Sequence, residues 1–325
     1  MKRIPAALLA AIAIASASMA HAASAFPDRP VRIIVGFPPG GGSDGIARIL
    51  AEHMGRTLKQ AVIVENKPGA NSTLGAAYVA SARPDGYTLL FGAESVLGAD
   101  KVAYAPTVSY GETSFTPINR IASSFFVLAT KKDSELRTFA DVAAKARQST
   151  TPMFIASPGG TYPEIVTADL KRLSGLNLDE VLYKGGSPAV MAVLGGDAPL
   201  TFMGPGAVLP MAREGKLNAV AITLDHRSQL MPEVPTLAES GVKGFAMSYW
   251  YGLMGPKGLP DDVVRTLFNA TSQALGDPAV QGRIAELGYE TMPMRSPQEF
   301  QALALKDGAA LRARVEALPV REAAR

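Results

Sequence analysis

Short apolar runs, each followed by a loop of small residues and then by a helical pattern, recur along the chain and most restrict its fold. The run Val31–Val35 is apolar apart from Arg32, which is typical of a strand largely buried on both faces of a parallel sheet. Loops and helical patterns separate it from two further runs, Val62–Val64 and Tyr87–Phe91. Because crossovers between parallel strands are right-handed, this alternation predicts one parallel sheet in the N-terminal part.

The same unit recurs in the second half of the chain. Four more strands are expected at 151–157, 180–183, 199–203 and 217–223. The first three of them run directly into small-residue loops that begin helices. Helical patterns then fill the C-terminal part at 261–275, 278–287 and 297–318. The last helix begins with a Ser–Pro–Gln–Glu sequence, which is typical of a capped helix N-terminus.

Two segments connect these regions, an apolar strand within 116–130 (125–129) and the segment 248–258. We read them as crossings between two α/β lobes, each a mainly parallel sheet flanked by helices. The expected division is lobe 1 at 26–124 plus 250–325 and lobe 2 at 125–249. Ligands of open parallel sheets bind at the carboxyl ends of the strands. The loops at those ends should therefore face a cleft between the lobes; they are 36–44, 92–96, 157–163, 184–188 and 204–207.

Residues 1–25 have the composition of a secretory signal peptide. Lys2 and Arg3 precede an apolar stretch from Ala6 to Ala17, and small residues near position 22 form a cleavage site. The apolar stretch is too short to span a bilayer. We expect an exported, periplasmic protein whose mature form begins near Ala23 or Phe26.

Composition excludes several classes of function. Removal of two basic residues and no acidic one lowers the formal charge from +3 to +1, and no basic run interleaves with aromatic residues, so we expect no nucleic-acid partner. The chain has no cysteine, which excludes disulfides, thiolate metal sites and a lipidated N-terminal cysteine. No Ser-His-Asp set, carboxylate pair or metal cluster occurs at a convincing spacing. The sequence predicts no catalysis, cofactor or metal.

The segment IIVGFPPGGGSD, Ile33–Asp44, admits three interpretations. A phosphate-binding P-loop needs a lysine where Gly42 stands, so we reject it. A dinucleotide-binding loop matches the spacing of Gly40, Gly42 and Gly45, with Glu65 as the ribose-binding acid. The residues between Gly36 and Gly40 lengthen that turn, however, and export argues against a supply of NAD.

The third interpretation is a carboxylate site at a helix N-terminus. Unpaired N–H groups and the helix dipole attract carboxylates as well as phosphates there. The loops PGGT, KGGSP and GPGA repeat the arrangement in the second lobe, which favours this interpretation. We expect Ser43 or Asp44 to cap the helix that follows the first loop.

The order and spacing of five segments resemble the extracytoplasmic substrate-binding proteins of tripartite tricarboxylate transporters, the TctC-like or Bug family. The segments are 26–48, 65–90, 183–197, 215–245 and 249–260. The resemblance covers nearly the whole mature chain. It implies a two-lobed, type II-like periplasmic binding protein that closes over a small carboxylate. It also implies that backbone amides and bridging waters of the first glycine loop and the YKGG loop hold one ligand carboxylate.

The resemblance implies a set of ligand contacts in each lobe. In the first lobe they are Phe37, Pro39, Gly40, Gly41 and Asp44. In the second lobe they are Ser157, Gly160, Thr161, Tyr183, Lys184, Gly185 and Gly186. The strand-end loops add Gly92, Ala93, Glu94 and Gly204. Asp44 has a helix-capping alternative, Lys184 a place at the rim, and Tyr249, Trp250 and Tyr251 a role in core or hinge packing.

Three positions depart from the family pattern: Tyr162-Pro163 where a polar pair is frequent, Glu94 where a neutral residue is usual, and MGPGA before a later helix. If Glu94 faces the ligand, the distal part of that ligand should be neutral or cationic, because like charges repel in a poorly hydrated site.

The sequence therefore predicts a receptor that captures a small organic carboxylate or an amino-acid-like ligand and delivers it to the permease of a tripartite tricarboxylate transporter. Two alternatives remain open at this point. One is an exported sensing module that docks on a sensor kinase. The other is a dinucleotide-dependent oxidoreductase.

Overall fold

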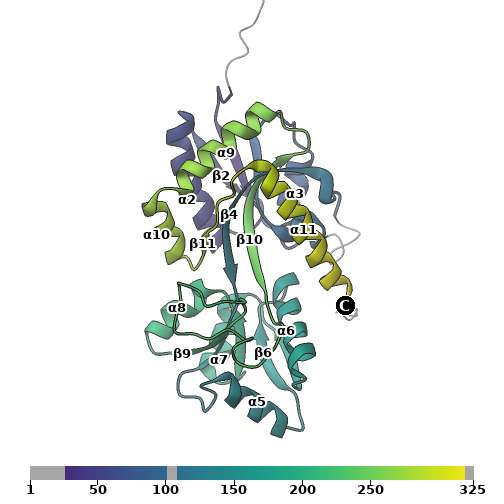
Figure 1. Cartoon of the computed structure of the whole chain (residues 1–325), viewed down its shortest axis with the longest axis vertical. Coiled ribbons are helices and arrows are strands. Elements are labelled where there is room, and N and C mark those ends of the chain that lie inside the picture. The colour runs from purple at the N-terminus through teal and green to yellow at the C-terminus, as the bar shows by residue number, and fades with distance from the viewer. Residues whose placement is uncertain (1–25, 101–107, 319–325) are drawn as a thin grey trace, which may run out of the picture.

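The computed structural model describes residues 26–100 and 108–318, which form two β-sheets stacked end to end, each flanked by helices (Figure 1). The six-stranded sheet and its helices make the first lobe, and the five-stranded sheet and its helices make the second. The signal peptide expected at 1–25 lies outside the described residues. Over the described ranges, no helix combines the length and apolar character needed to cross a membrane.

The first sheet is mixed, with the strand order β11-β4-β10-β3-β1-β2. Its strands are β1 (Val31–Val35), β2 (Val62–Asn66), β3 (Thr88–Ala93), β4 (Phe115–Phe125), β10 (Ser248–Pro256) and β11 (Glu290–Thr291). β1 pairs in parallel with β2 and β3, which confirms the expected parallel unit. β10 is antiparallel to both β3 and β4, and β11 is antiparallel to β4.

The second sheet has the order β7-β6-β8-β5-β9. Its strands are β5 (Val127–Lys131), β6 (Met153–Ser157), β7 (Leu178–Leu182), β8 (Leu200–Met203) and β9 (Leu217–Ile222). β6 is parallel to β7 and β8, whereas β5 is antiparallel to β8 and β9. Both sheets are mixed, because the strands that pass between the lobes, β4, β5 and β10, run antiparallel to their neighbours. The two-lobed α/β class itself is confirmed.

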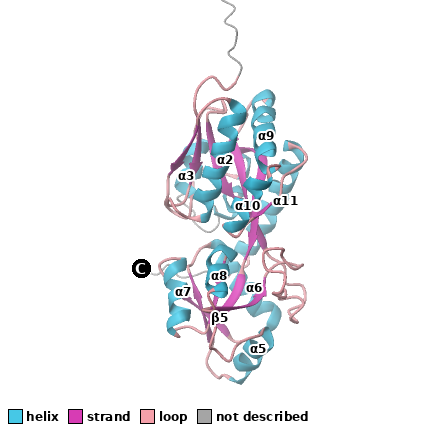
Figure 2. Cartoon of the chain, turned by 90° about the vertical axis from the view of Figure 1, so that its left-hand side faces the viewer, coloured by secondary structure: helices cyan, strands magenta, loops and turns pink. Residues whose placement is uncertain are grey.

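Helices cover both faces of each sheet (Figure 2). In the first lobe α2, α9 and α10 pack on one face, and α3, the 3-10 helix η1 and α11 pack on the other. In the second lobe α5 and α6 cover one face, and α7 and α8 cover the other. The bounds are α2 Gly42–Leu58, α3 Thr73–Ala80, η1 Glu94–Leu97, η2 Glu112–Ser114, α5 Phe139–Gln148, α6 Thr161–Ser174, α7 Gly186–Gly195, α8 Pro205–Arg213, α9 Asp261–Leu275, α10 Pro278–Glu286 and α11 Pro297–Glu316.

Alternation along the strands explains these layers. In β1, Ile33 packs with residues of α2, whereas its neighbour Ile34 packs with residues of α3 and α11. In β5, Leu128 and Val127 likewise enter different cores. Because successive side chains of a strand point to opposite faces, a sheet covered on both faces needs continuously apolar strands. The apolar runs of the sequence meet that requirement.

The lobes are joined by two crossings. β4 ends at Phe125 in the first sheet and β5 begins at Val127 in the second, so the single strand expected at 125–129 is wrong. The chain changes sheets at Phe126, and it returns to the first sheet where β10 begins at Ser248.

Helix α11 runs along the junction and contacts both lobes (Figure 1). Phe300 packs in the core of the first lobe, whereas Leu311 and Val315 pack in the core of the second. Arg314 Nη2 also lies 3.1 Å from Asp169 Oδ2 of α6. The expected domain boundaries stay a prediction, and the assignment of 250–325 to lobe 1 omits these contacts of α11 with lobe 2.

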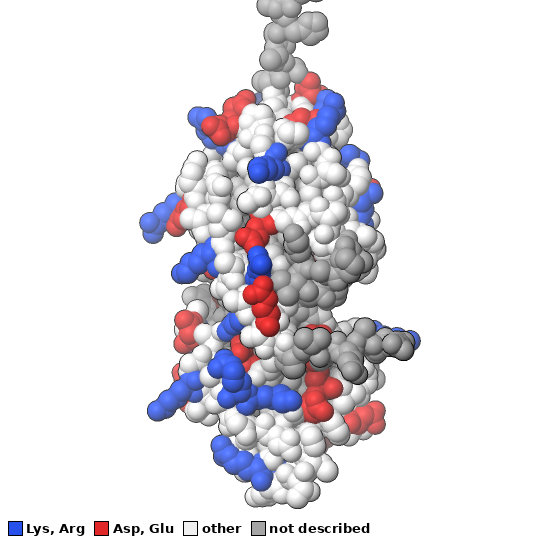
Figure 3. Space-filling model, turned by 90° about the vertical axis from the view of Figure 1, so that its right-hand side faces the viewer, with Lys and Arg blue, Asp and Glu red and all other residues white. Residues whose placement is uncertain are grey.

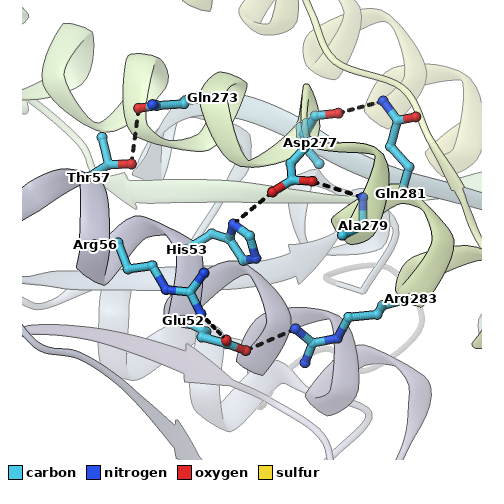
Figure 4. A network of polar contacts seen from close by, with 10 residues as sticks. Glu52, His53, Arg56, Thr57, Gln273, Asp277, Ala279, Gln281 and Arg283 are labelled. Atoms are coloured by element: carbon cyan, nitrogen blue, oxygen red, sulfur yellow. Dashed lines mark hydrogen bonds and ion pairs between the residues drawn. The ribbon is translucent and has the colours of Figure 1, made fainter.

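A polar network connects α2 to α10 on the surface of the first lobe (Figure 4). Arg283 Nη1 donates to Glu52 Oε2 at 2.9 Å, and His53 Nδ1 lies 3.7 Å from Asp277 Oδ2. Exposed ion pairs contribute only about 0–1 kcal/mol each to the free energy of unfolding. The apolar face of α2, rather than this network, therefore carries most of its attachment to the lobe.

Gly252 of β10 gives a test of how tightly α11 packs on the first sheet. An alanine Cβ there would lie 2.4 Å from Phe300 Cζ and 3.2 Å from Trp250 Cζ3. We expect Gly252→Ala to lower the free energy of unfolding in urea by about 1–3 kcal/mol, because overpacking a filled core forces side chains from their preferred rotamers. Gly282→Ala in α10 is the matched control, since its Cβ meets open space. An unchanged value for Gly252→Ala would show that the core repacks freely around Phe300.

Candidate functional site

Five helices begin at the junction of the lobes, and none of them has a side chain that caps its first turn. The residues at their N-cap positions are Gly41 of α2, Ser72 of α3, Gly160 of α6, Gly185 of α7 and Gly204 of α8. The first backbone N–H groups of an uncapped helix have no partner within the helix. These five N-termini therefore offer donors and positive dipole ends to an anion.

Helices that begin away from the junction have side-chain caps or acidic residues at their N-termini. The N-cap side chains Thr138 of α5, Asp277 of α10 and Ser296 of α11 each accept a hydrogen bond from the first turn of their helix. Helix α9 has no side-chain cap, but Asp261 and Asp262 stand in its first turn. At the junction, α2 and α6 have Asp44 and Glu164 in their first turns, whereas α3, α7 and α8 have neither a side-chain cap nor an acid there.

Contacts across the junction bring loops of the two lobes together. The Ser95 backbone N–H donates to Tyr162 Oη at 3.1 Å, which links η1 to α6. A Cβ on Gly160 would lie 3.7 Å from Asn71 Oδ1, so the N-terminus of α6 faces the loop that precedes α3. A Cβ on Gly206 would lie 2.4 Å from the Leu287 carbonyl oxygen, which places the start of α8 against the end of α10.

Four tyrosines form an aromatic group at the centre of this junction, which we call the tyrosine cluster: Tyr162, Tyr249, Tyr251 and Tyr289. The ring of Tyr249 lies 5.2 Å from that of Tyr162 and 6.0 Å from that of Tyr251, and the Tyr251 and Tyr289 rings are 5.9 Å apart. Tyr289 shares hydrogen bonds with Tyr249 and Tyr251.

The tyrosine cluster lies against two of the uncapped helices and is part of a third. A Cβ on Gly42 of α2 would lie 2.7 Å from Tyr289 Oη, and one on Gly204 would lie 3.4 Å from Tyr249 Oη. Tyr162 itself belongs to the first turn of α6. Burial raises the pKa of each of these phenols, so the hydroxyls stay protonated.

Several buried polar atoms near the junction lack a partner among the described residues. They include Ser72 Oγ, Thr161 Oγ1 and Asp100 Oδ1. Thr161 is 4% exposed and opens the first turn of α6, and Ser72 is 3% exposed at the start of α3. Because an unsatisfied buried polar atom costs about 1–3 kcal/mol, such atoms usually have a partner. Their position at the junction is consistent with a ligand or water as that partner.

The loop before α3 is strained. Ala70, Asn71 and Ser72 have φ angles of 43°, 52° and 76°, a left-handed conformation that side chains other than glycine seldom adopt. Strain of about 1–3 kcal/mol per residue persists where surrounding contacts impose it, often at binding sites. Here it places Asn71 and Ser72 opposite the start of α6.

Asp100 is a fully buried acid beside this loop. Ser95 Oγ donates to its Oδ2 at 3.2 Å, and Asn71 also donates a hydrogen bond to the carboxyl. Burial raises the pKa of Asp100 to about 7, because the two hydrogen bonds only partly offset the loss of hydration. The sequence analysis did not find Asp100, since it follows Gly98-Ala99 outside the loops expected to face the cleft.

In the first glycine loop, Asp44 is a scaffold residue. Its carboxylate accepts hydrogen bonds of 2.9 Å from the Gly40 N–H, Arg48 Nε and Asn66 Nδ2. Burial opposes ionisation, but these hydrogen bonds outweigh it and lower the pKa of Asp44. The expected cap at Ser43 or Asp44 is wrong, because α2 begins at Gly42 with Gly41 as its N-cap. Asp44 instead holds the loop from inside the first turn.

The other expected contacts of this loop divide between core and surface. Phe37 packs against the first-lobe core, and its carbonyl oxygen accepts a hydrogen bond of 3.0 Å from Asn66 Nδ2. Pro39, Gly40 and Gly41 are exposed. Gly40 has a φ of +86°, and nothing but the Pro38 carbonyl oxygen, 3.8 Å away, would meet a Cβ on Gly41. The loop therefore leaves open space beside its backbone.

The expected loops of the second lobe lie side by side. The Tyr183 N–H donates to the Ser157 carbonyl oxygen at 2.8 Å, and Ser157 Oγ accepts from the Gly159 N–H at 3.1 Å. Gly160 and Gly185 have φ angles of +96° and +106°, which require glycine at both N-caps. Beyond these N-caps, Gly186 begins α7 and Gly204 precedes α8. Lys184 is exposed.

The three expected contacts at the end of β3 and the start of η1 are buried rather than exposed in a loop. Gly92 and Ala93 are buried residues of β3, opposite Gly252 and Tyr251 of β10. Glu94 is 6% exposed, and it lines a cavity of about 250 Å³ together with residues of α11. No described contact tests whether any of the three touches a ligand, so their role stays a prediction.

The residues that match a dinucleotide-binding loop have other contacts. Glu65 pairs with Lys67 at 2.8 Å and Arg32 at 3.6 Å, and Gly45 packs against Leu287. Within 26–100 and 108–318, no group of three or more His, Asp or Glu side chains is placed to hold a metal ion.

Comparison with known proteins identifies a family and several proteins that this chain resembles. Residues 46–315 match the profile of the tripartite tricarboxylate transporter family receptor, TctC. Protein BugT of Bordetella pertussis is 34% identical over 282 residues, which cover 85% of this chain and 86% of that protein.

Two solved structures of Rhodopseudomonas palustris proteins resemble the fold throughout. MatC with bound malate has a TM-score of 0.76 at 30% identity and covers 89% of this chain and 100% of its own. Rpa4515 with adipate has a TM-score of 0.79 at 26% identity and covers 91% of this chain and 100% of its own. The similarity thus extends over both lobes and their junction.

Asp100 makes the stability of the ligand-free protein depend on pH. Its pKa is near 7 in the folded state and 3.8 ordinarily, so the folded state holds an extra proton between those values and stability falls as pH rises through that window. Asp100→Asn should raise the free energy of unfolding in urea by up to about 4 kcal/mol at pH 8 and change it little at pH 4. Asp179→Asn, at an exposed site in β7, is the control. A gain for Asp100→Asn that is the same at both pH values would contradict this cause.

Proposed function

Because the chain belongs to the tripartite tricarboxylate transporter family of receptors, we propose that it binds a small organic carboxylate between its lobes. Members of this family are periplasmic solute-binding proteins, and we infer the same location for this chain from the signal-peptide pattern at 1–25. The family consists of receptors rather than enzymes, so neither a catalytic role nor the oxidoreductase alternative gains support.

The observation that carries the proposal is the meeting of uncapped helix N-termini from both lobes. Four of the five N-cap residues are glycines, so a carboxylate can approach the backbone N–H groups without meeting a side chain. Each N-terminus adds about half a positive charge. In the proposed complex the ligand contacts Gly40 and Gly41 in the first lobe and the loops 157–161, 183–186 and 204 in the second.

The two bound ligands named for the structural neighbours, malate and adipate, are both dicarboxylates. We infer a ligand of the same class here, with its second carboxylate near the unpartnered hydroxyls of Ser72 and Thr161. The phenols of the tyrosine cluster supply further hydroxyl donors beside these sites. Asp100 favours this class when it is protonated, because it then donates rather than repels.

A receptor of this kind signals occupancy through the relative position of its lobes. A ligand that touches both lobes stabilises the arrangement in which both sets of contacts form. In our proposal the closed form docks on the permease of a tripartite tricarboxylate transporter. No observation on this chain favours the sensor kinase as partner over the permease.

Gly41 tests the glycine-loop contact without disturbing the fold. Its φ is −81° and its Cβ would face open space, so valine fits the protein itself. We expect Gly41→Val to keep the wild-type melting temperature and to weaken dicarboxylate binding by at least about tenfold in isothermal titration, because the Cβ branches occupy the approach to the N–H groups. Gly282→Val, at an exposed position of α10 whose Cβ meets open space, should bind normally. Wild-type affinity in Gly41→Val would place the ligand elsewhere.

Thr161 tests the contact from the second lobe. Valine has the shape of threonine without the unpartnered hydroxyl, so Thr161→Val should raise the free energy of unfolding by about 1 kcal/mol or leave it unchanged. The same substitution should weaken dicarboxylate binding by about tenfold, since a hydrogen bond to a charged group contributes about 1.5–3 kcal/mol. Lower stability together with unchanged affinity would assign the hydroxyl a structural role.

A further inference from the structure

The cavity that Glu94 lines lies at the junction beside α11, and we call it the hinge pocket. Its volume is about 250 Å³, and its floor includes Glu94, which is 6% exposed. One wall is formed by Asp307 and Arg314 of α11, and another by Asp225 and the segment 246–248 that enters β10. Both lobes and a crossing segment thus contribute to one pocket.

Carboxylates dominate the polar lining of the hinge pocket. Glu94, Asp225 and Asp307 line it, and Asp307 Oδ2 accepts a hydrogen bond of 3.0 Å from Trp250 Nε1. Glu94 forms no hydrogen bond and no ion pair with any residue of 26–100 or 108–318. A buried carboxyl group without such partners is costly when ionised.

The one cation that lines the described part of this pocket is already engaged. Arg314 Nη2 donates to the Ala246 carbonyl oxygen at 3.2 Å and lies 3.1 Å from Asp169 Oδ2 outside the pocket. Arg314 therefore forms an ion pair with Asp169, which does not line the pocket, and neutralises the pocket carboxylates only in part. Side chains of both signs surround the junction on this side of the molecule, where α11 lies (Figure 3). Among the described lining residues three carboxylates outnumber this one guanidinium, and Asp225 also lies 2.6 Å from His226 Nδ1 outside the pocket.

The rest of the lining indicates the chemical class of an occupant. Leu224, Met247 and Leu311 provide an apolar wall next to the acids. The described carboxylates of the chain nowhere form a group that could hold a metal ion. An organic cation with a short hydrocarbon part satisfies both halves of the pocket, whereas an anion would meet three carboxylates. The volume lies just below the range of about 300–1,000 Å³ that is typical of drug-sized ligands, so the occupant should be small.

We propose that the hinge pocket binds a small aliphatic ammonium compound, with the Glu94 carboxylate as its buried counterion. This site goes beyond the proposed carboxylate function, since it uses different residues and the opposite ligand charge. An ammonium group donates up to three hydrogen bonds, which matches the acceptors of Glu94 and Asp307. A charge-assisted hydrogen bond in a poorly hydrated site is stronger than a neutral one.

Protons compete with the ammonium group in this arrangement. Burial, and then the charge of Asp307, raise the pKa of Glu94 well above its usual value, while Arg314 and Arg120 lower it in part. Tyr162 of α6 and Asp225 after β9 are the other titratable groups that face Glu94 or the pocket. A protonated Glu94 offers no counterion, so the ammonium compound should bind more weakly as pH falls.

The test uses the full chain and n-butylammonium chloride, with potassium chloride at equal ionic strength as a reference. We expect a saturable rise of melting temperature with butylammonium that potassium does not give. The apparent affinity should be higher at pH 8 than at pH 5.5. Glu94→Gln should weaken it by at least about tenfold and remove its pH dependence. Glu214→Gln removes an exposed carboxylate outside the pocket and should bind like wild type.

A second pair of variants tests the role of the pocket volume rather than that of the Glu94 charge. Ala310 is exposed at the edge of the pocket, so Ala310→Leu should fill the entrance without disturbing the core and should weaken butylammonium binding. Ala309→Leu, its exposed neighbour outside the lining, should have no effect. Equal shifts with potassium, no saturable shift in wild type, or wild-type binding by Glu94→Gln would each overturn the proposal. Loss of dicarboxylate binding in Gly41→Val with butylammonium binding intact would separate the two sites.

Discussion

The absence of side-chain caps on the helices at the lobe junction is the constraint on which the site depends. A side-chain cap satisfies the first-turn N–H groups and also fills the space in front of them. Glycine at Gly41, Gly160, Gly185 and Gly204 leaves that space open. Replacing a good cap by glycine costs only a few tenths of a kcal/mol per helix. The chain can therefore keep several N-termini free at a cost that one well-packed core residue offsets.

The tyrosine cluster determines how these N-termini are positioned relative to one another. Its members come from α6, from one face of β10 near its start, and from the turn before β11, so they join the two lobes through side chains. Tyr289 and Tyr249 approach the starts of α2 and α8 within ordinary contact distance of the backbone. Aromatic pairs of this kind contribute about 0.5–1.5 kcal/mol each beyond their buried area. The tyrosine cluster thus stabilises the junction by aromatic packing and also supplies hydroxyl donors.

The sequence could predict the helices, strands and glycine loops, but not these contacts between side chains that are distant in the sequence. Continuous apolar runs located β1, β3 and β6, and the Ser296 cap located the start of α11, because both signals are local. The glycine loops were found for the same reason. The directions of β4 and β10 were not predicted, since they depend on how the chain passes between the lobes. Tyr289, whose partners in the tyrosine cluster are 38 or more positions away, carries no local signal.

Local sequence patterns also gave the wrong role for one acidic residue and overlooked another. Asp44 was expected to cap α2 because Ser and Asp are good caps, but the helix begins two residues earlier and Asp44 binds Arg48, Asn66 and the Gly40 N–H. Asp100 was overlooked because its buried position arises from contacts with Asn71 and Ser95 rather than from its neighbours in sequence.

The segment η1 lies between the hinge pocket and the proposed carboxylate site. Its first residue, Glu94, opens to the hinge pocket, while the next, Ser95, donates its N–H to Tyr162 and its hydroxyl to Asp100. Adjacent residues of a short 3-10 helix cannot move independently, because one hydrogen-bonded turn fixes both. The Ser95–Tyr162 hydrogen bond therefore ties the first turn of α6 to the residue next to Glu94. One backbone turn thus joins a hydrogen bond between the lobes to the lining of the hinge pocket.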